Sequence, residues 1–392
     1  MKVLLWGCTY SMWTIHFIEK VLLKNHHEVW LLKNSNKKEF LDSFQKMGVH
    51  LIECPETVTD WYDGGKDAGA LRTLYIHFLQ VRLAVKCGHF DVINLQYVDY
   101  ADVVDVVILK YIMRAKLILS YWGSDLLRVS GRILSFAGIF AKRADYVTFD
   151  NGDLKIKFEQ KYQWKDRVKS SKALFGLAIL DIIREKQENQ AAVFIRKKWG
   201  IPENKKIVAI GYNGIPQQQH IKVLECLKNI DEDVKDRICI LLQMSYGGTA
   251  EYRKTVMEAV KKTGCQYAAI EHFLTAEEVA EIRIMTDIFI NAQITDAFSG
   301  SVCENLYADS VLINAGWLRY QEFIEYDFKY LEFENISEIE RIIPMVLEQG
   351  FDVSGNKELV WQLRSWESCG SKWEKIYRKV LGNNEESVSY GS

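Results

Sequence analysis

Short apolar runs rich in β-branched residues alternate with amphipathic segments of helical period along most of the 392-residue chain. This alternation predicts βαβ units, in which parallel strands are joined by crossover helices. The strands expected in the first half are Lys2–Trp6, Glu28–Leu32, Asp91–Leu95, Lys116–Ser120 and Tyr146–Phe149. Those expected in the second half are Ile207–Gly211, Ile238–Gln243, Cys265–Ile270, Ile288–Asn291 and Val311–Asn314. The pattern indicates an α/β chain with two parallel sheets.

A polar, charge-rich stretch at 154–200 separates the two series of strands. Because 392 residues exceed what one hydrophobic core usually organises, we expect two Rossmann-like domains, residues 1–185 and 186–365. Ligands of open parallel sheets bind beyond the carboxyl ends of the strands. A cleft between the two domains is therefore the expected place for chemistry.

Several common functional classes lack their motifs in this chain. The loop after the first expected strand, Gly7-Cys-Thr-Tyr-Ser-Met-Trp, is not G-x-G-x-x-G, so a nicotinamide cofactor has little support. No P-loop and no Ser-His-Asp nucleophile elbow occur. The eight cysteines form no C-x-x-C pair, and Asp231-Glu-Asp233 lies in a charged stretch that we interpret as solvated surface. We expect no metal, no cofactor and no nucleic-acid partner.

Basic residues are concentrated in the first half. Residues 1–180 carry 25 Lys and Arg against 19 Asp and Glu, whereas the remainder carries 25 against 33. A basic first half suits contact with anionic lipid heads or a phosphate-bearing substrate, although mild asymmetry of this kind is also common. The segment Leu126–Arg143 is either a membrane-surface helix or an amphipathic helix that faces the core. With no evident signal peptide or transmembrane segment, we expect a cytoplasmic protein, with or without peripheral contact with the inner membrane.

Two acids flank a small polar loop after the expected strand Ile288–Asn291, in the sequence Asp296-Ala-Phe-Ser-Gly-Ser-Val-Cys-Glu304. The small residues that should open the next helix are Ser299, Gly300 and Ser301. The free N–H groups and positive dipole end of such a helix can hold a diphosphate. Asp296 can then reach sugar hydroxyls, and Glu304 can accept hydrogen bonds from a ribose diol. An ordinary helix cap explains the local pattern equally well.

A second candidate loop follows the first strand of the second domain and reads Gly211-Tyr-Asn-Gly-Ile-Pro-Gln-Gln-Gln-His220. Its backbone N–H groups, Asn213 and His220 can contact a phosphate. The alternative for His220 is a polar residue at a helix start that faces solvent. The loop is favoured as a site because it follows the carboxyl end of a strand.

The ends of two further strands carry candidates for contact with a planar ligand. Gln243 ends one strand and is followed by a loop with two glycines, whose backbone groups are accessible to a ligand edge. Tyr246 in that loop and Phe273 after the next strand can stack on a planar ring. Packing beneath the loop is the alternative for Phe273.

The first domain offers candidates for the acceptor side. Asp125 follows a strand and the pair Gly123-Ser124, so it can act as a general base or cap the next helix. Tyr10, Ser11 and Trp13 follow the first strand and can line an acceptor pocket, although Trp13 can also be a core residue.

The acid–seven residues–acid pattern of Asp296 and Glu304 resembles the E-x7-E signature of a large family of retaining GT-B glycosyltransferases, with Asp in place of the usual first Glu. Other segments are similar in the same order, from about residue 90 to about residue 325: His89-Phe-Asp-Val-Ile-Asn-Leu-Gln and Ser120-Tyr-Trp-Gly-Ser-Asp125-Leu. The second of these also resembles the bacterial transferases that add N-acetylfucosamine to lipid-linked enterobacterial common antigen. The chain departs from the large family in lacking the Arg and Lys that usually follow the first strand of the second domain.

The resemblance implies a GT-B fold and metal-independent transfer of a sugar, with retention, from a nucleotide-sugar to a glycan or lipid-linked oligosaccharide in bacterial surface polysaccharide synthesis. It also implies that the loops carrying Gln243, Tyr246 and Phe273 hold the nucleotide base, with the backbone reading its edge and Tyr246 or Phe273 stacking on it. It further implies that a final helix, at about 366–382, packs back onto the first domain. The missing cations and the Asp-for-Glu change leave two alternatives. One is a catalytically silent GT-B subunit that binds glycan or a partner enzyme, and the other is a sugar-nucleotide epimerase.

Overall fold

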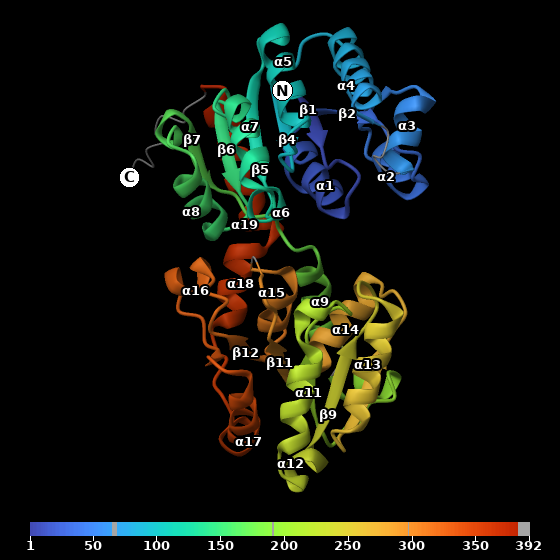
Figure 1. Cartoon of the computed structure of the whole chain (residues 1–392), viewed down its shortest axis with the longest axis vertical. Coiled ribbons are helices and arrows are strands. Elements are labelled where there is room, and N and C mark those ends of the chain that lie inside the picture. Colours follow the sequence, from blue (N-terminus) through green and yellow to red (C-terminus); the bar gives the residue numbers. More distant parts are fainter. Residues whose placement is uncertain (65–68, 190–191, 297, 383–392) are drawn as a thin grey trace. The chain divides into compact units, whose positions relative to one another are not determined.

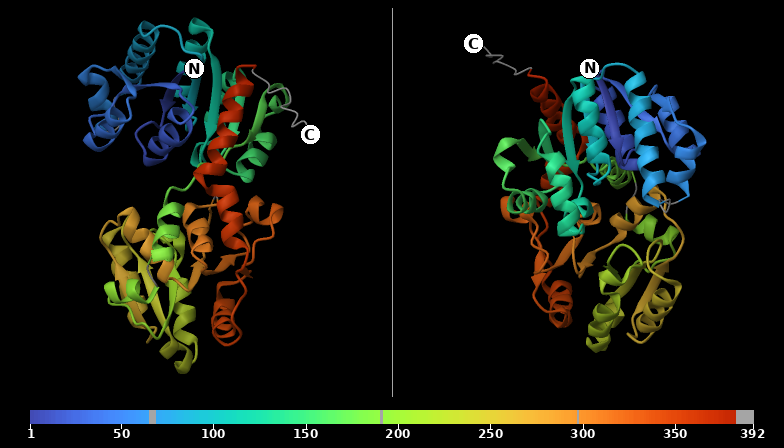
Figure 2. Two further views of the ribbon diagram at one scale, coloured as in Figure 1. Left: turned by 180° about the vertical axis from the view of Figure 1, so that it is seen from behind. Right: turned by 45° about the horizontal axis from the view of Figure 1, so that its top comes forward.

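The computed structural model describes residues 1–64, 69–189, 192–296 and 298–382. The chain divides into two compact units, which Figures 1 and 2 show. Unit 1 comprises Met1–Gly176 and the C-terminal segment from Trp366 onward, and unit 2 comprises Leu177–Ser365. Each unit contains a parallel sheet with helices around it, so the predicted α/β class is confirmed.

The described part of unit 1 contains a seven-stranded sheet in the order β3-β2-β1-β4-β5-β6-β7, with all paired strands parallel. Its strands are β1 (Lys2–Gly7), β2 (Glu28–Lys33), β3 (His50–Glu53), β4 (Val92–Gln96), β5 (Lys116–Tyr121), β6 (Tyr146–Phe149) and β7 (Lys169–Lys172). The chain runs outward from β1 to β3 and then returns to β4 on the other side of β1. This reversal makes β1 and β4 a topological switch point, where open α/β sheets bind ligands.

Helices cover both faces of this sheet. They are α1 (Met12–Phe17), the π-helical η1 (Ile18–Leu23), α2 (Lys38–Lys46), α3 (Glu56–Asp63), α4 (Gly69–Lys86), α5 (Asp102–Met113), α6 (Ser124–Leu127), α7 (Gly131–Ala141), α8 (Gly152–Lys161), η2 (Lys165–Arg167) and α19 (Trp366–Val380). Because parallel crossovers are right-handed, α4, α5 and α7 lie on one face and η1 lies on the other. Figure 2 shows α19, in red, on the same face as η1, which it contacts.

The terminal helix α19 is fixed to unit 1 by buried polar contacts. Glu374 lies 2.8 Å from Nε2 of His27, and the Tyr377 hydroxyl donates to Asn94 Oδ1 at 2.8 Å. The indole N–H of Trp373 donates to the carbonyl oxygen of Leu174 at 3.1 Å. Trp373 and Tyr377 are both fully buried, as expected for core anchors.

Unit 2 contains, in its described residues, a six-stranded sheet in the order β10-β9-β8-β11-β12-β13, again with parallel pairs. Its strands are β8 (Lys206–Ile210), β9 (Ile238–Gln243), β10 (Gln266–Ile270), β11 (Ile288–Asn291), β12 (Val311–Ala315) and β13 (Leu331–Phe333). The order reverses between β8 and β11, so the loops after these two strands flank the switch point of unit 2.

The helices of unit 2 lie on both faces of its sheet (Figure 1). They are α9 (Ile179–Asn189), α10 (Ala192–Lys198), η3 (Pro216–Gln218), α11 (His220–Asn229), α12 (Glu232–Arg237), α13 (Ala250–Lys261), α14 (Ala276–Met285), α15 (Gly300–Tyr307), α16 (Gln321–Glu325), η4 (Ile336–Glu338), α17 (Ile339–Gln349) and α18 (Asn356–Arg364). Among the described residues of the whole chain, no helix has both the length and the apolar character needed to cross a bilayer.

The division between the units differs from the predicted boundary at 185. The first unit ends at Gly176, and α9 belongs to unit 2 because Leu180 and Ile183 are buried in the core of that unit. These two apolar residues stand within a charged stretch, so the sequence pattern hid their role. The final helix expected at about 366–382 corresponds to α19, which is separated from α18 by an extended backbone at Ser365.

Candidate functional site

The loop after β11 carries Asp296 at the switch point of unit 2. The half-buried carboxylate of Asp296 accepts a hydrogen bond from the Tyr320 hydroxyl at 2.6 Å and one from the backbone N–H of Ser299 at 3.3 Å. Asn291, the last residue of β11, donates to the Tyr320 oxygen at 2.9 Å. This chain of hydrogen bonds starts in the sheet and fixes the direction of the Asp296 carboxylate.

The backbone before α15 is held in an unusual conformation. Phe298 has a φ of 54°, which non-glycine residues rarely adopt, and its buried ring packs against Tyr320 and Phe323. The helix then begins at Gly300, with Ser299 as an N-cap whose side chain makes no capping bond among the described residues. The predicted helix start is confirmed, and its first N–H groups and dipole end remain available for an anion.

One buried side chain, Arg283 of α14, joins three of the predicted site residues. Its Nε donates to Glu304 at 2.9 Å, and its two terminal nitrogens donate to Gln243 Oε1 at 2.7 Å and to Ser301 Oγ at 3.0 Å. The side chains of Arg283 and Glu304 are 4% and 13% exposed. The guanidinium therefore fixes the strand end at Gln243 and the first turn of α15 in one rigid arrangement.

The loops after β8 and β9 pack backbone against backbone. The N–H of Gly214 donates to the carbonyl oxygen of Tyr246 at 2.8 Å, and Arg253 donates to the carbonyl oxygen of Gly247 at 2.7 Å. Buried Asn213 uses its side-chain oxygen to accept the N–H of Ile215 at 3.2 Å, and Gly211 opens the loop with a φ of 62°. Asn213 and Gly211 thus shape the predicted phosphate loop from within.

Gly248 should tolerate no side chain. A Cβ there would lie 1.9 Å from the carbonyl oxygen of Gly214, with a φ of 66°. Gly248→Ala is expected to lower the free energy of unfolding by about 3 kcal/mol, measured by urea denaturation. Gly200→Ala is the matched control, because its φ is 64° but no described atom lies within 4 Å of its Cβ, and it should cost about 1 kcal/mol. Equal losses for the two variants would contradict this packing.

The structure places His220 differently from the prediction. The side chain is 0% exposed at the start of α11, and its Nδ1 lies 3.2 Å from the Tyr252 hydroxyl. Burial lowers the pKa of His220 from 6.5 to about 4, so the ring is neutral near pH 7. A buried, neutral imidazole brings no positive charge to a phosphate, and the alternative of a solvent-facing residue is wrong because the side chain is buried. The residue supports the loop from beneath.

The same burial makes stability depend on pH. Because the folded pKa of His220 lies below its unfolded value, the unfolded chain binds more protons between about pH 4 and about pH 6.5, and stability falls as the pH falls through that range. For this one group the loss from about pH 7 to about pH 5 is about 2 kcal/mol. The variant His220→Phe should lose correspondingly less in urea unfolding at the two pH values. An identical loss in both proteins would contradict a buried neutral His220.

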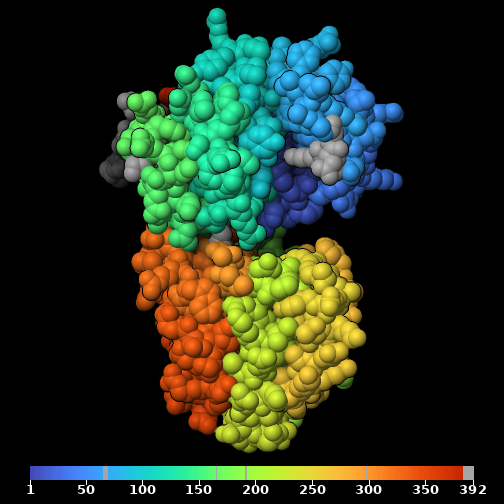
Figure 3. Space-filling model, in the orientation of Figure 1, coloured from blue at the N-terminus to red at the C-terminus, as the bar shows by residue number. Residues whose placement is uncertain are grey.

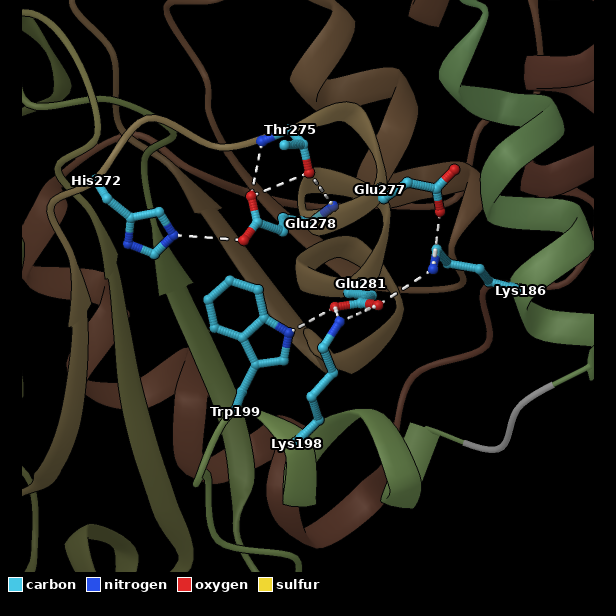
Figure 4. Close-up of polar contacts among 8 residues, drawn as sticks. All are labelled: Lys186, Lys198, Trp199, His272, Thr275, Glu277, Glu278 and Glu281. Carbon is cyan, nitrogen blue, oxygen red and sulfur yellow. Dashed lines mark hydrogen bonds and ion pairs between the residues drawn. The ribbon is translucent and has the colours of Figure 1, made fainter.

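The loop after β10 is braced by a polar network around Glu281 of α14 (Figure 4). Buried Glu281 accepts from Lys198 at 2.8 Å, from the Trp199 indole at 2.8 Å and from Lys186 at 3.1 Å. The Trp199 ring stacks on His272 with a centroid distance of 6.2 Å. Next to His272, the Phe273 ring is 80% exposed.

The two predicted base-stacking residues are both accessible. Phe273 stands on the braced loop, and Tyr246 is 49% exposed on the loop after β9. The alternative for Phe273, packing beneath its loop, is wrong because the ring faces solvent. Both rings are free to stack on a planar ligand, which remains their predicted role.

Asp125 is a structural carboxylate in this arrangement. It is 2% exposed in unit 1, and its oxygens accept the backbone N–H groups of Val98, Trp122 and Gly123 at 2.7–3.1 Å. Burial raises its pKa, and the backbone hydrogen bonds oppose that shift. Such a group ties the loops after β4 and β5 together, and at 2% exposure it is closed off from an acceptor. The general-base prediction for Asp125 is therefore not supported, and a loop-organising role is.

A polar cavity of about 280 Å³ opens at the carboxyl ends of β1, β2 and β4 in unit 1. Its lining includes Gly7, Tyr10, Asn34, Ser35, Lys37, Tyr62, Asp63, Tyr97, Asp99 and Asp102. Of the three predicted acceptor-pocket residues, Tyr10 lines the cavity. Ser11 instead caps α1 by accepting the N–H of Thr14, and Trp13 packs edge-on against Phe175.

Beneath this cavity lie His77, Asp102 and Asp105. Each offers one potential metal-ligand atom, and these three atoms lie within 4.8 Å of one another. His77 Nδ1 lies 2.6 Å from Asp105, and Asp102 accepts the Trp6 indole N–H at 3.2 Å. Burial lowers the pKa of His77, but the hydrogen bond and charge of Asp105 outweigh that effect and the net shift is upward. We interpret the set as a buried His–Asp ion pair.

Chains with two Rossmann-like units recur in known structures. A solved glycosyltransferase from Rickettsia africae matches 98% of this chain and 99% of its own length, with a TM-score of 0.76 and 13% identity. The chain has the GT-B fold. Anabaena HepE in complex with UDP (TM-score 0.69, 15% identity, 97% of this chain and 100% of HepE) shares this fold. So does sucrose-phosphate synthase of Thermosynechococcus elongatus (TM-score 0.70, 11% identity, 98% and 99%).

No protein-family model matches the sequence, and no curated protein matches it either. At 11–15% identity, the likeness to the three structures concerns the GT-B fold itself. What the GT-B fold of this chain does must be argued from its own residues.

Proposed function

We propose that the protein is a glycosyltransferase, with unit 2 holding a nucleotide-sugar and unit 1 holding the acceptor. The observation that carries this proposal is the switch point of unit 2. There α15 begins at Gly300, four residues after Asp296 and four before Glu304, and no described side chain caps its N-terminus. Tyr320 fixes the carboxylate of Asp296, and Arg283 fixes that of Glu304. HepE, which has the same fold, binds UDP in its solved complex.

The donor would be bound by backbone and buried polar groups more than by surface cations. The diphosphate would lie at the N–H groups of Gly300 and Ser301, where the dipole of α15 stabilises negative charge. Glu304 would accept the ribose hydroxyls, since Arg283 holds its carboxylate in place. Tyr246 and Phe273 would stack on the base, and Asp296 would contact the transferred sugar.

The resemblance to the E-x7-E family supports transfer with retention and without a metal. The N–H groups at the start of α15 would stabilise the leaving diphosphate as its charge develops. The acceptor would be a glycan or a lipid-linked oligosaccharide of a bacterial surface polysaccharide, bound in the polar cavity beside Tyr10. Hydroxyl, amide and carboxylate groups in that cavity suit the hydroxyls of a sugar.

A thermal-shift screen of UDP-, GDP- and dTDP-sugars tests donor binding. A true donor should raise the melting temperature with increasing concentration, and by the same amount in EDTA. Glu304→Ala should remove the shift, whereas Glu258→Ala, on the exposed side of α13, should keep it. If none of these nucleotide-sugars shifts the melting temperature, the donor site is contradicted.

Turnover of the identified donor separates the two remaining alternatives. A transferase forms a glycoside only when an acceptor is present, and NMR of the anomeric proton shows whether the configuration is retained. Conversion of the donor sugar without acceptor would identify an epimerase. Donor binding without either reaction, across lipid-linked and soluble glycan acceptors, would favour a silent subunit.

A further inference from the structure

Three neighbouring helices of unit 1 expose large apolar side chains on the same side of the sheet. Helix α4 contacts α5, and α5 contacts α7, so their outer surfaces are continuous (Figure 3). The exposed apolar residues are Leu71, Leu74, Tyr75 and Phe78 on α4, Ile108, Tyr111 and Ile112 on α5, and Ile133, Phe136 and Ile139 on α7. Each is at least 40% exposed. We call this surface the α4–α5–α7 face.

The apolar residues on α4 do not belong to the protein core. Their spacing of three and four residues places Leu71, Leu74, Tyr75 and Phe78 on one stripe of the helix. The opposite stripe, with Ile76 and Ala84, is the one that is fully buried. The helix is therefore apolar on two sides, and only one side is used for packing within the described part of unit 1.

The charge around these side chains is mainly positive, and the nearby acid Asp145, whose side chain is 26% exposed, is paired with Lys110 and Lys116. Segments 69–90 and 106–144 contain ten Lys and Arg, and Asp125 is their only acidic residue. Asp125 is buried in its loop, so these segments expose no acid. The exposed basic residues are Arg72, Arg82, Lys86, Arg114, Lys116, Arg128, Arg132, Lys142 and Arg143. This arrangement accounts for much of the excess positive charge of the first half.

We propose that the α4–α5–α7 face docks on an anionic lipid surface. Surfaces that lie in the lipid headgroup region combine leucine, isoleucine and aromatic side chains with arginine and lysine. The basic groups contact lipid phosphates, and the apolar groups enter the boundary of the acyl chains. A surface that binds a protein partner is expected to carry both positive and negative charges, because the surface of the partner also carries both. The excess of unpaired basic side chains therefore favours a membrane.

The position of α4 connects this face with the acceptor cavity. Residues Tyr62 and Asp63 at the end of α3 line the cavity, and α4 begins six residues later. Because α4 returns the chain to the amino edge of the sheet, its first turns, with Leu71 and Leu74, start at the carboxyl edge where the cavity opens. Docking would bring the cavity to lipid-linked acceptors. Membrane binding itself does not depend on the proposed transferase reaction.

Co-sedimentation of the full chain with phosphatidylcholine vesicles, with and without phosphatidylglycerol, tests the proposal. Wild-type protein should bind only the anionic vesicles, and raising the salt from about 0.15 M to about 1 M should weaken binding. Phe78→Ser/Ile112→Ser and Arg72→Gln/Arg132→Gln should each reduce partitioning by about tenfold. The matched controls in unit 2 are Phe194→Ser/Ile324→Ser and Lys254→Gln/Lys261→Gln, whose residues are equally exposed and should leave binding unchanged.

Three outcomes of the binding experiments would overturn the proposal. Wild-type protein that stays in the supernatant with anionic vesicles contradicts it, and so does equal loss of binding in the unit 2 controls. Binding to native membranes but not to vesicles of their extracted lipid would indicate a membrane protein as partner. The melting temperature and nucleotide-sugar binding of each variant are measured in parallel. Loss of donor binding with intact vesicle binding would reject the transferase and leave the membrane face standing.

Discussion

Replacing Arg283 with methionine should lower the free energy of unfolding by about 3–5 kcal/mol. The change leaves the carboxylate of Glu304, whose side chain is 13% exposed, without its cation, and it also removes the donors to Gln243 and Ser301. A buried acceptor that loses its partner retains its full cost of desolvation. Because the guanidinium also sets the direction of Glu304, nucleotide-sugar affinity should fall by at least about tenfold.

Urea unfolding and calorimetric titration measure the two effects of Arg283→Met. The double variant Arg283→Met/Glu304→Gln removes the unpaired charge, so it should recover most of the lost stability but none of the nucleotide affinity. Arg184→Met is a matched surface control, because its ion pair with Asp181 is largely solvent-exposed and should contribute less than about 1 kcal/mol. An Arg283→Met protein as stable as the control would contradict the role of the buried network.

Substituting Asp296 with asparagine should slow sugar transfer by about a hundredfold, with little change in stability. The amide keeps the size of the side chain and can still accept the Tyr320 hydrogen bond, but it loses the charge that would strengthen a bond to a sugar hydroxyl. Since the proposed base and ribose contacts would lie elsewhere, the affinity for the free nucleotide should be unchanged. Initial rates at saturating donor measure the effect.

Tyr320→Phe provides the comparison for Asp296→Asn. It removes the 2.6 Å hydrogen bond that orients the carboxylate but leaves the charge in place. Its loss of kcat should therefore be smaller, about tenfold, with the affinity for free nucleotide again unchanged. If Asp296→Asn transfers sugar at the wild-type rate, Asp296 has no contact with the reacting sugar.

The strands at the centres of both sheets could be predicted from the sequence because they are apolar on both faces. β6, β9 and β11 occur at the expected residues, and the start of α15 lies within the expected loop. The edge strands β3, β7 and β13 were missed. The sequence of β7 is Lys-Ser-Ser-Lys. An edge strand with an exposed face needs few apolar residues, so no apolar run marks β7 in the sequence.

The long-range partners of polar residues could not be predicted. Arg283 stands in the apolar run Ile-Arg-Ile-Met of α14, which signals a buried cation but not its ligands Glu304 and Gln243. His27 contacts Glu374, which is 347 residues away, so no local pattern around His27 indicates this partner. The sequence left alternatives open for His220 and Asp125 for the same reason, since burial decides their chemistry and short sequence patterns do not record it.

The central claim is that the loop from Asp296 to Glu304 holds a nucleotide-sugar, and calorimetric titration of UDP and of the donor from the screen tests it most directly. Glu304→Gln should weaken both ligands by about tenfold or more, because Glu304 would contact the ribose that both contain. Asp296→Asn should weaken only the nucleotide-sugar, and Glu258→Gln should change neither affinity. If both ligands bind Glu304→Gln and Asp296→Asn as tightly as wild-type protein, the donor is held elsewhere and the claim is wrong.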